Sequence, residues 1–255
     1  MLKTLCPIQF SPELAYHIGI EREYFITDAD GKIVPAAKEV LSILPKIPNV
    51  GEYSYELSAC QIELKSVPCK TLSHVQETQH ELEEVLDTTL QKMGLSRLTT
   101  SVASANMPLD VYKDPSGRYA RLVANMPREI LQAACQITGT HVHIGMPDSI
   151  TALHAYNQAI AYCEELNARG DNADGKRLEL YQLVAPNCLP VAYTSWKDFC
   201  TYANQHGFGE NLQNCWHLIR LTRHGTIEFR NFGATNSINT VIEWATVCRN
   251  LCIPA

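Results

Sequence analysis

A period-two pattern of side chains over one short segment constrains this fold more than any other feature. Between residues 16 and 26, Ile18 and Ile20 fall at even positions, whereas Glu21 and Glu23 fall at odd positions. A period of two is typical of a β-strand with one buried face and one polar face. Sheets whose faces differ in this way are usually antiparallel, so the segment predicts an antiparallel sheet with a covered apolar face.

The remaining patterns predict further strands and a set of helices. Strands are expected at 52–57, 60–67, 95–105, 135–146, 215–221 and 226–232. Apolar residues at helical spacing, such as Leu82, Leu86 and Leu90, predict a long helix at 72–93. Other helices are expected at 118–134 with a break at Pro127, from 148 or 149 to about 168, and at 176–184, 195–206 and 237–251. The prediction is an α+β fold in a single domain over residues 1–255, with helices packed on one face of a mostly antiparallel sheet.

Composition narrows the function classes. The net charge is −6 and no long basic run is present, which argues against a nucleic-acid-binding protein. The sequence contains no run of about 18 apolar residues, the length needed to span a membrane. Its start also lacks the long apolar segment of a signal peptide, so a cytoplasmic protein is expected. The 10 cysteines are scattered without a CxxC pair and are expected to be free thiols.

Carboxylates gather on the expected polar strand faces. Glu21 and Glu23 point the same way, and two like charges side by side cost stability unless a cation separates them. The competing interpretation is an ordinary solvated polar face. Glu56 and Glu63 flank the connection between two expected strands. Glu56 and Glu63 lie near Glu21 and Glu23 only if their strands pair beside the strand expected at 16–26; otherwise they are ordinary surface glutamates.

Two later strands carry imidazoles, a carboxylate and an arginine. His141 and His143 share a face between two glycines, and glycine in a strand often marks the close approach of a ligand or another backbone. Glu228 and Arg230 also share a face. Histidines without ligands and a plain ion pair are the competing interpretations.

Taken together, these groups indicate a site for hard cations. Several carboxylates with an imidazole suit Mg²⁺ or Mn²⁺. Such ions bridge nucleotide phosphates and neutralise the charge that develops in phosphoryl transfer. The sequence has no Walker A motif, no kinase glycine loop and no GxGxxG. If ATP binds here, metal ions and arginines on the sheet must hold it.

The same segments resemble a known family. Residues 19–25 (GIEREYF), 62–63 (IE), 139–145 (GTHVHIG) and 225–230 (GTIEFR) resemble the motifs of the bacterial and plant type of glutamate–cysteine ligase. This family includes carboxylate–amine ligases of unsettled substrate and is more distantly similar to glutamine synthetase. The matching blocks follow the family order from about residue 16 to 250. The resemblance implies a glutamine synthetase-like catalytic fold, in which a curved antiparallel sheet forms a funnel for ATP and the carboxylate substrate.

The resemblance also implies roles for individual residues. Two or three Mg²⁺ ions, with Mn²⁺ as the alternative, would be surrounded by Glu21, Glu23, Glu56, Glu63, His141 and Glu228. Arg220 and Arg230 would bind the ATP phosphates, with Arg230 and Glu228 acting in catalysis. Arg118, Tyr119 and His143 would lie on the substrate side. The implied reaction is phosphorylation of a carboxylate by ATP, followed by attack of an amine on the acyl phosphate to form a γ-glutamyl-type amide.

Substrate identity and activity are left open by one departure from the family. The chain is shorter than typical members between His154 and Trp196, where the family shapes its substrate pocket. The expected partners are an amino acid or another carboxylate and an amine acceptor, without nucleic acid or membrane; a small homo-oligomer is compatible with the family. A metal-dependent hydrolase, and a degenerate relative that only binds nucleotide or amino acid, are the alternative functions.

Overall fold

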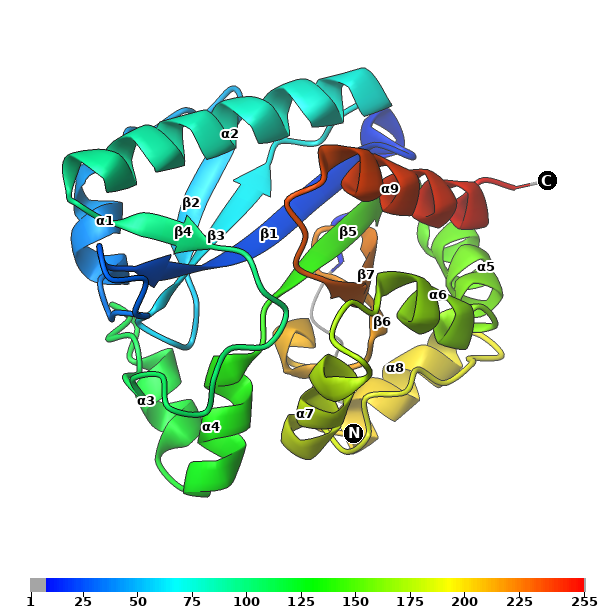
Figure 1. Ribbon diagram of the computed structural model, residues 1–255. Coiled ribbons are helices and arrows are strands. Elements are labelled where there is room, and N and C mark those ends of the chain that lie inside the picture. Colours follow the sequence, from blue (N-terminus) through cyan, green and yellow to red (C-terminus); the bar gives the residue numbers. More distant parts are fainter. Residues whose placement is uncertain (1–7, 255) are drawn as a thin grey trace.

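A seven-stranded sheet forms the centre of the computed structural model, which describes residues 8–254 (Figure 1). The main strand order is β2-β3-β1-β5-β7-β6, β4 pairs with the far end of β1, and all of these pairs are antiparallel. The strands are β1 (Ile18–Thr27), β2 (Gly51–Tyr55), β3 (Gln61–Ser66), β4 (Ser96–Leu98), β5 (Gly139–Gly145), β6 (Ile219–Leu221) and β7 (Thr226–Gly233). The predicted mostly antiparallel sheet is confirmed.

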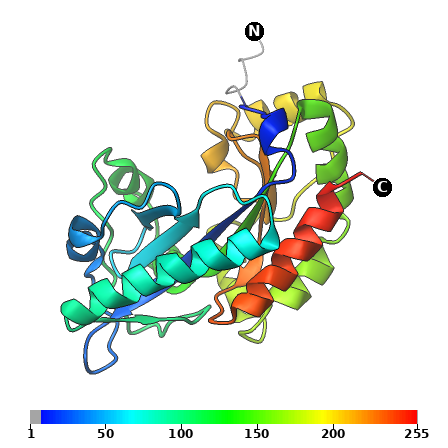
Figure 2. The same ribbon diagram turned by 90° about the horizontal axis from the view of Figure 1, so that it is seen from above.

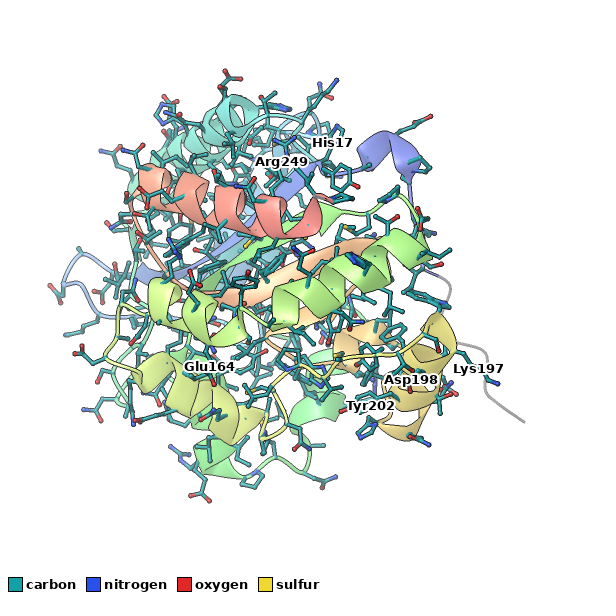
Figure 3. All side chains as sticks on the ribbon, turned by 90° about the vertical axis from the view of Figure 1, so that its right-hand side faces the viewer. His17, Glu164, Lys197, Asp198, Tyr202 and Arg249 are labelled. Carbon is teal, nitrogen blue, oxygen red and sulfur yellow. The ribbon has the colours of Figure 1, made fainter. Side chains whose placement is uncertain are left out.

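Long helices cover one face of this sheet, which confirms the predicted α+β class. In Figure 2, α2 (Leu72–Lys92) and α9 (Ile238–Cys252) run along the same side of the strands. Figure 3 shows α5 (Ser149–Ile160) and α6 (Cys163–Gly170) beside α9 in front of the sheet. The shorter helices are α1 (Ala37–Ile43), α3 (Arg118–Val123), α4 (Arg128–Gln136), α7 (Lys176–Val184) and α8 (Trp196–Gln205).

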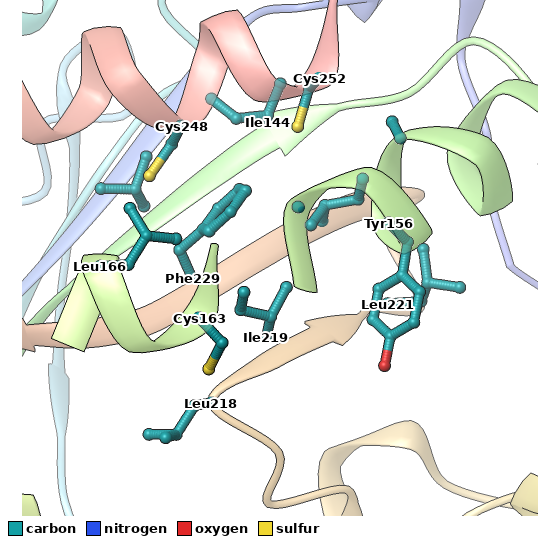
Figure 4. Packing of buried hydrophobic residues seen from close by; sticks show 14 of the residues in the cluster. Ile144, Tyr156, Cys163, Leu166, Leu218, Ile219, Leu221, Phe229, Cys248 and Cys252 are labelled. Atoms are coloured by element: carbon teal, nitrogen blue, oxygen red, sulfur yellow. The ribbon is translucent and has the colours of Figure 1, made fainter. Parts of the chain in front are cut away.

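The alternation in the sequence explains why the helices lie on that face. Ile18 and Ile20 of β1 are fully or almost fully buried in the main core. The same core contains Ile144 and Phe229 of the neighbouring strands, which face Cys248 of α9 (Figure 4). Burial of each such side chain contributes roughly 1.5–3 kcal/mol, so this face fixes the register of the strands.

The predicted elements differ from the structure at several places. The strands expected from residues 135 and 215 begin only at Gly139 and Ile219, since α4 continues to Gln136 and a short 3-10 turn at Leu212–Asn214 precedes β6. The strand expected at 95–105 is limited to Ser96–Leu98, because β5 pairs with the same edge of β1 at residues 18–22 and leaves only residues 25–27 for β4. The helix expected to run to about residue 168 is interrupted after Ile160 and restarts at Cys163, with no proline or glycine at the break. Helix α1 was not predicted, because its seven residues are too few for a clear helical period.

Other expectations about the chain are confirmed for the described residues. Helix α4 begins directly after Pro127, as expected from the missing N–H and fixed backbone angle of proline. The described cysteines are free, and all of them except Cys200 are buried. Among the described helices, none is long and apolar enough to cross a membrane.

Candidate active site

The face of the sheet opposite the long helices carries the predicted carboxylates and imidazoles. The antiparallel register places Glu23 of β1 opposite Glu63 of β3, and Glu21 of β1 opposite His141 of β5. It also places His143 of β5 opposite Glu228 of β7. Because each of these residues lies on the polar side of its strand, the sheet itself brings them together. Segments more than 200 residues apart in the sequence therefore meet in one cluster.

Three overlapping sets in this acidic cluster have the geometry to hold a cation. Within each set the candidate ligand atoms all lie within 4.8 Å of one another. The sets are Glu21–His143–Glu228, Glu21–Glu63–His141 and Glu23–Glu56–Glu63. Every residue predicted to be a metal ligand lies in at least one set. His143, which was predicted on the substrate side, lies in a set as well.

The half of the cluster around Glu56 and Glu63 holds three carboxylates, those of Glu23, Glu56 and Glu63, against the single ammonium group of Lys65. Burial raises the pKa of Glu63 from 4.5 to about 7, and the repulsion from Glu21 adds to this shift. Burial, together with the neighbouring Glu63 and Glu23 carboxylates, also raises the pKa of Glu56 well above its ordinary value. A carboxylate whose charged form is disfavoured in this way gains most from a nearby cation.

The half around Glu228 is already neutralised by two arginines. Arg220 Nε and Arg230 Nη1 each lie 2.6 Å from a Glu228 carboxylate oxygen. Burial alone would raise the pKa of Glu228, but attraction to Arg220 and Arg230 lowers it well below the ordinary range. Glu228 is therefore ionised at neutral pH and fixes both guanidinium groups at the edge of the cluster.

The two imidazoles are positioned differently. Burial, followed by repulsion from Arg230, lowers the pKa of His141 to about 4, so this ring is neutral at physiological pH. The Nδ1 atom of His143 lies 3.0 Å from the Thr226 hydroxyl, which leaves Nε2 directed at Glu21 Oε2, 3.5 Å away. This buried Nε2 has no hydrogen-bond partner. An imidazole ring in which one nitrogen makes a hydrogen bond and the other makes none is typical of a metal-binding histidine.

Two cavities open on either side of the cluster. One, of about 720 Å³, is lined by the cluster itself and by Arg220, Arg230, Arg118 and Tyr119. The other, of about 920 Å³, has a largely apolar lining that includes Ile47 and Met146. Residues common to both cavities are Glu21, Glu52, Lys65, His143 and His224. The acidic cluster thus lies at the junction of a polar cavity and a more apolar one.

Three residues of the site were missed from the sequence. The Tyr181 hydroxyl accepts a 3.1 Å hydrogen bond from Arg230 Nε, and the buried Arg177 donates to the Arg230 carbonyl at 3.2 Å. A Cβ atom on Gly139 would clash with Arg177 and lie 2.8 Å from the Phe232 carbonyl, so the expected close approach at this glycine is present. Lys65 Nζ lies 2.7 Å from Glu63 Oε2. Lys65 could have been found from the sequence, because it lies two residues after Glu63 on the same strand face. No sequence pattern pointed to Arg177 and Tyr181 on α7.

Without divalent ions, Glu63 should make stability fall as pH rises. The folded protein holds the Glu63 proton with a pKa of about 7 against an ordinary value of 4.5. This contribution is complete below about pH 4.5 and is lost as pH rises through about 7, at a cost of at most on the order of 3 kcal/mol. Urea unfolding in EDTA should show that the free energy of unfolding falls more between about pH 5 and pH 8 in the wild type than in Glu63→Gln. Because the two proteins differ only at position 63, an identical pH dependence would contradict the raised pKa of Glu63.

A sequence profile described as Glutamate-cysteine ligase family 2 (GCS2) matches residues 17–251, nearly the whole chain. The chain belongs to this family. Membership confirms the predicted family and its class, the carbon–nitrogen ligases that form amide bonds. The segments that carry the cluster all lie within the matched range.

Known proteins of the family and of related fold resemble the chain over most of its length. It is 25% identical to "Putative glutamate--cysteine ligase 2" of Gloeobacter violaceus, over 96% of this chain and 70% of that protein. It is 26% identical to "Putative glutamate--cysteine ligase 2-1" of Rubrobacter xylanophilus, over 88% of this chain and 63% of that protein. A bifunctional glutathione synthetase from Pasteurella multocida shares the fold, with a TM-score of 0.65 and 14% identity over 94% of this chain and 39% of that chain.

Proposed function

We propose that this chain is an ATP-dependent carboxylate–amine ligase that forms a γ-glutamyl-type amide through an acyl phosphate. A substrate carboxylate would attack the γ-phosphate of ATP, and ADP would leave. An amine would then attack the acyl carbon, and phosphate would leave as the amide forms. The observation that carries this proposal is the junction of two cavities, at which an acidic cluster and two fixed arginines meet on one sheet face.

The donor set fits divalent cations. Carboxylate oxygens with one or two imidazoles suit Mg²⁺ or Mn²⁺, and the unpartnered Nε2 of His143 together with the raised pKa of Glu56 and Glu63 supports a cation there. We propose Mg²⁺ in the cell, held by the sets Glu21–His143–Glu228 and Glu23–Glu56–Glu63. Bound Mg²⁺ would neutralise charge on the phosphates and on the transferring phosphoryl group.

The arginines and the cavities would arrange the substrates. Arg220 and Arg230 face the polar cavity from one side, with their guanidinium groups held by Glu228, and would contact phosphate oxygens. Arg118 and Tyr119 line the same cavity from α3 and would contact the carboxylate substrate. The more apolar cavity suits the nucleotide base. A preorganised arrangement of this kind lowers the barrier mainly through electrostatics.

The substrate pair and the setting are also part of the proposal. The names of the two relatives support glutamate and cysteine as the first pair to test. We further propose a cytoplasmic location and a small homo-oligomer.

ADP release from Mg²⁺-ATP, measured with amino acids singly and in pairs, tests this function. We expect release that requires one carboxylate donor and rises with a particular amine. ATP binding without ADP release for any pair would favour a degenerate relative instead. Turnover of an amide or a phosphoester without ATP would favour the metal-dependent hydrolase.

Arg230→Lys should reduce ADP release by about 10²-fold, because lysine cannot reproduce the planar guanidinium contacts. In the structure, Arg230 bonds Glu228 and Tyr181 at once, at 2.6 Å and 3.1 Å. Steady-state kinetics with the active substrate pair measures the effect, and Arg169→Lys on the exposed surface of α6 is the matched control. Turnover of Arg230→Lys near that of the wild type would show that the guanidinium group of Arg230 is not required for catalysis.

A further inference from the structure

Lys65 places a positive charge inside the acidic cluster. It lies on β3 directly opposite Glu21 of β1, on the same face of its strand as Glu63. Its Nζ atom lies 2.7 Å from Glu63 Oε2 and 3.9 Å from Glu21 Oε1. These two carboxylates, with His141, form the central one of the three cation-binding sets. The ammonium group therefore contacts the same oxygens that a metal ion in this set would use.

The Lys65 side chain carries a positive charge at neutral pH, as an ordinary lysine does. Its ammonium group lies within ion-pair distance of both the Glu63 and the Glu21 carboxylate. A protonated amine has only N–H donors and no lone pair, so it cannot be a metal ligand. It also repels a divalent ion bound by the same carboxylates. An ammonium and a metal ion in this central set are thus alternatives.

The other members of the two remaining sets lie outside the reach of Lys65, although Arg220 and Arg230 already contact both carboxylate oxygens of Glu228. Glu228 and His143 on one side, and Glu23 and Glu56 on the other, are not within ion-pair distance of Lys65 Nζ among the described contacts. Glu21 and Glu63 each have two carboxylate oxygens and can serve an outer set while one oxygen faces the ammonium. The arrangement is a row of three cation positions with a lysine at the middle one.

We propose that the Lys65 ammonium acts as a built-in cation that replaces a divalent ion at the Glu21–Glu63–His141 set. This chain would then hold one metal ion fewer than its carboxylates and imidazoles could support. The inference rests on the metal site of the proposed function. Lys65 is a positioning residue on this view, because it sets the number and spacing of metal ions around the nucleotide phosphates.

Counting bound Mn²⁺ tests the proposal without any need for turnover. Free and bound Mn²⁺ are measured by electron paramagnetic resonance in titrations of the wild type, Lys65→Met and Lys65→Arg, each first treated with EDTA. We expect Lys65→Met to bind one more ion per chain than the wild type, and Lys65→Arg to bind the wild-type number. Lys70→Met, which removes an exposed lysine outside the cluster, should also bind the wild-type number. Adding Glu63→Gln to Lys65→Met should abolish the extra ion.

The outcomes separate this inference from the proposed function. Wild-type Mn²⁺ binding with an unchanged number and affinity in Lys65→Met overturns the role of Lys65 but leaves the metal site intact. Weaker ATP binding with an unchanged ion count also overturns it, since Lys65 would then contact phosphate. No Mn²⁺ binding in the wild type or in any variant removes the metal site itself. If Lys65→Met does not fold, Lys65→Gln keeps a hydrogen-bond donor toward Glu63 and carries the same expectation.

Discussion

Glu228→Gln should reduce ADP formation from Mg²⁺-ATP by about 10²- to 10³-fold, a loss typical of removing a preorganised electrostatic group. Glu228 is 1% exposed and forms ion pairs with both Arg220 and Arg230. It also belongs to a cation-binding set with Glu21 and His143. Glutamine keeps the shape but not the charge, so the two guanidinium groups would lose their anchor and the set would lose a ligand.

Initial rates with saturating substrates measure this effect, together with the Mg²⁺ dependence of ATP binding by calorimetry. Glu243→Gln is the matched control, because Glu243 is an exposed glutamate on α9. The control should keep wild-type rates and ATP affinity. Unchanged Mg²⁺-dependent ATP binding in both Glu228→Gln and Glu23→Gln would count against the cluster as the nucleotide–metal site.

Glu83→Gln should lower the free energy of unfolding by about 3–5 kcal/mol, because it leaves a buried charge without its partner. Arg22, on the helix-covered face of β1, is 1% exposed, and its Nη1 atom lies 3.0 Å from Glu83 Oε1 on α2. The same oxygen accepts a 2.7 Å hydrogen bond from the Tyr24 hydroxyl and lies 2.9 Å from Arg97. One carboxylate therefore joins the longest helix to the central strand.

Urea denaturation at neutral pH, followed by circular dichroism, measures the loss. Glu84→Gln on the exposed side of the same helix turn is the matched control and should stay within about 0.5 kcal/mol of the wild type. Equal stabilities of Glu83→Gln and Glu84→Gln would show that Arg22 does not depend on its ion pair.

The period-two pattern carried most of the information about the fold and the site. It assigned the two faces of β1 correctly. The glutamates at positions 21, 23 and 63 meet through the pairing of β1 with β3, and Glu56 joins them from just beyond the end of β2. This was predictable because a strand fixes the direction of every side chain once one face is buried. The family match then confirmed the class of protein that the motifs indicated.

The features that were missed depend on contacts between distant segments. Arg177 and Tyr181 lie on α7, in the segment that was expected to depart from the family pattern, and only tertiary packing brings them to Arg230. The interruption between α5 and α6 contains no helix-breaking residue, so no signal for it was present in the sequence. The shared strand face of His141 and His143 was visible in the sequence, but the hydrogen bond of His143 Nδ1 to Thr226, which directs Nε2 at Glu21, depends on a neighbouring strand.

The two faces of β1 have a consequence for how this protein can change over evolution. Odd positions of the strand carry Glu21 and Glu23, while the intervening Arg22 joins the strand to α2. Inserting or deleting one residue in this strand would turn the side chains beyond that point to the opposite face of the sheet. It would bury uncompensated carboxylates under the helices and turn Arg22 toward the cluster. A substitution in β1 alters one side chain, whereas a change of one residue in its length would alter both faces and destroy both stability and the candidate site.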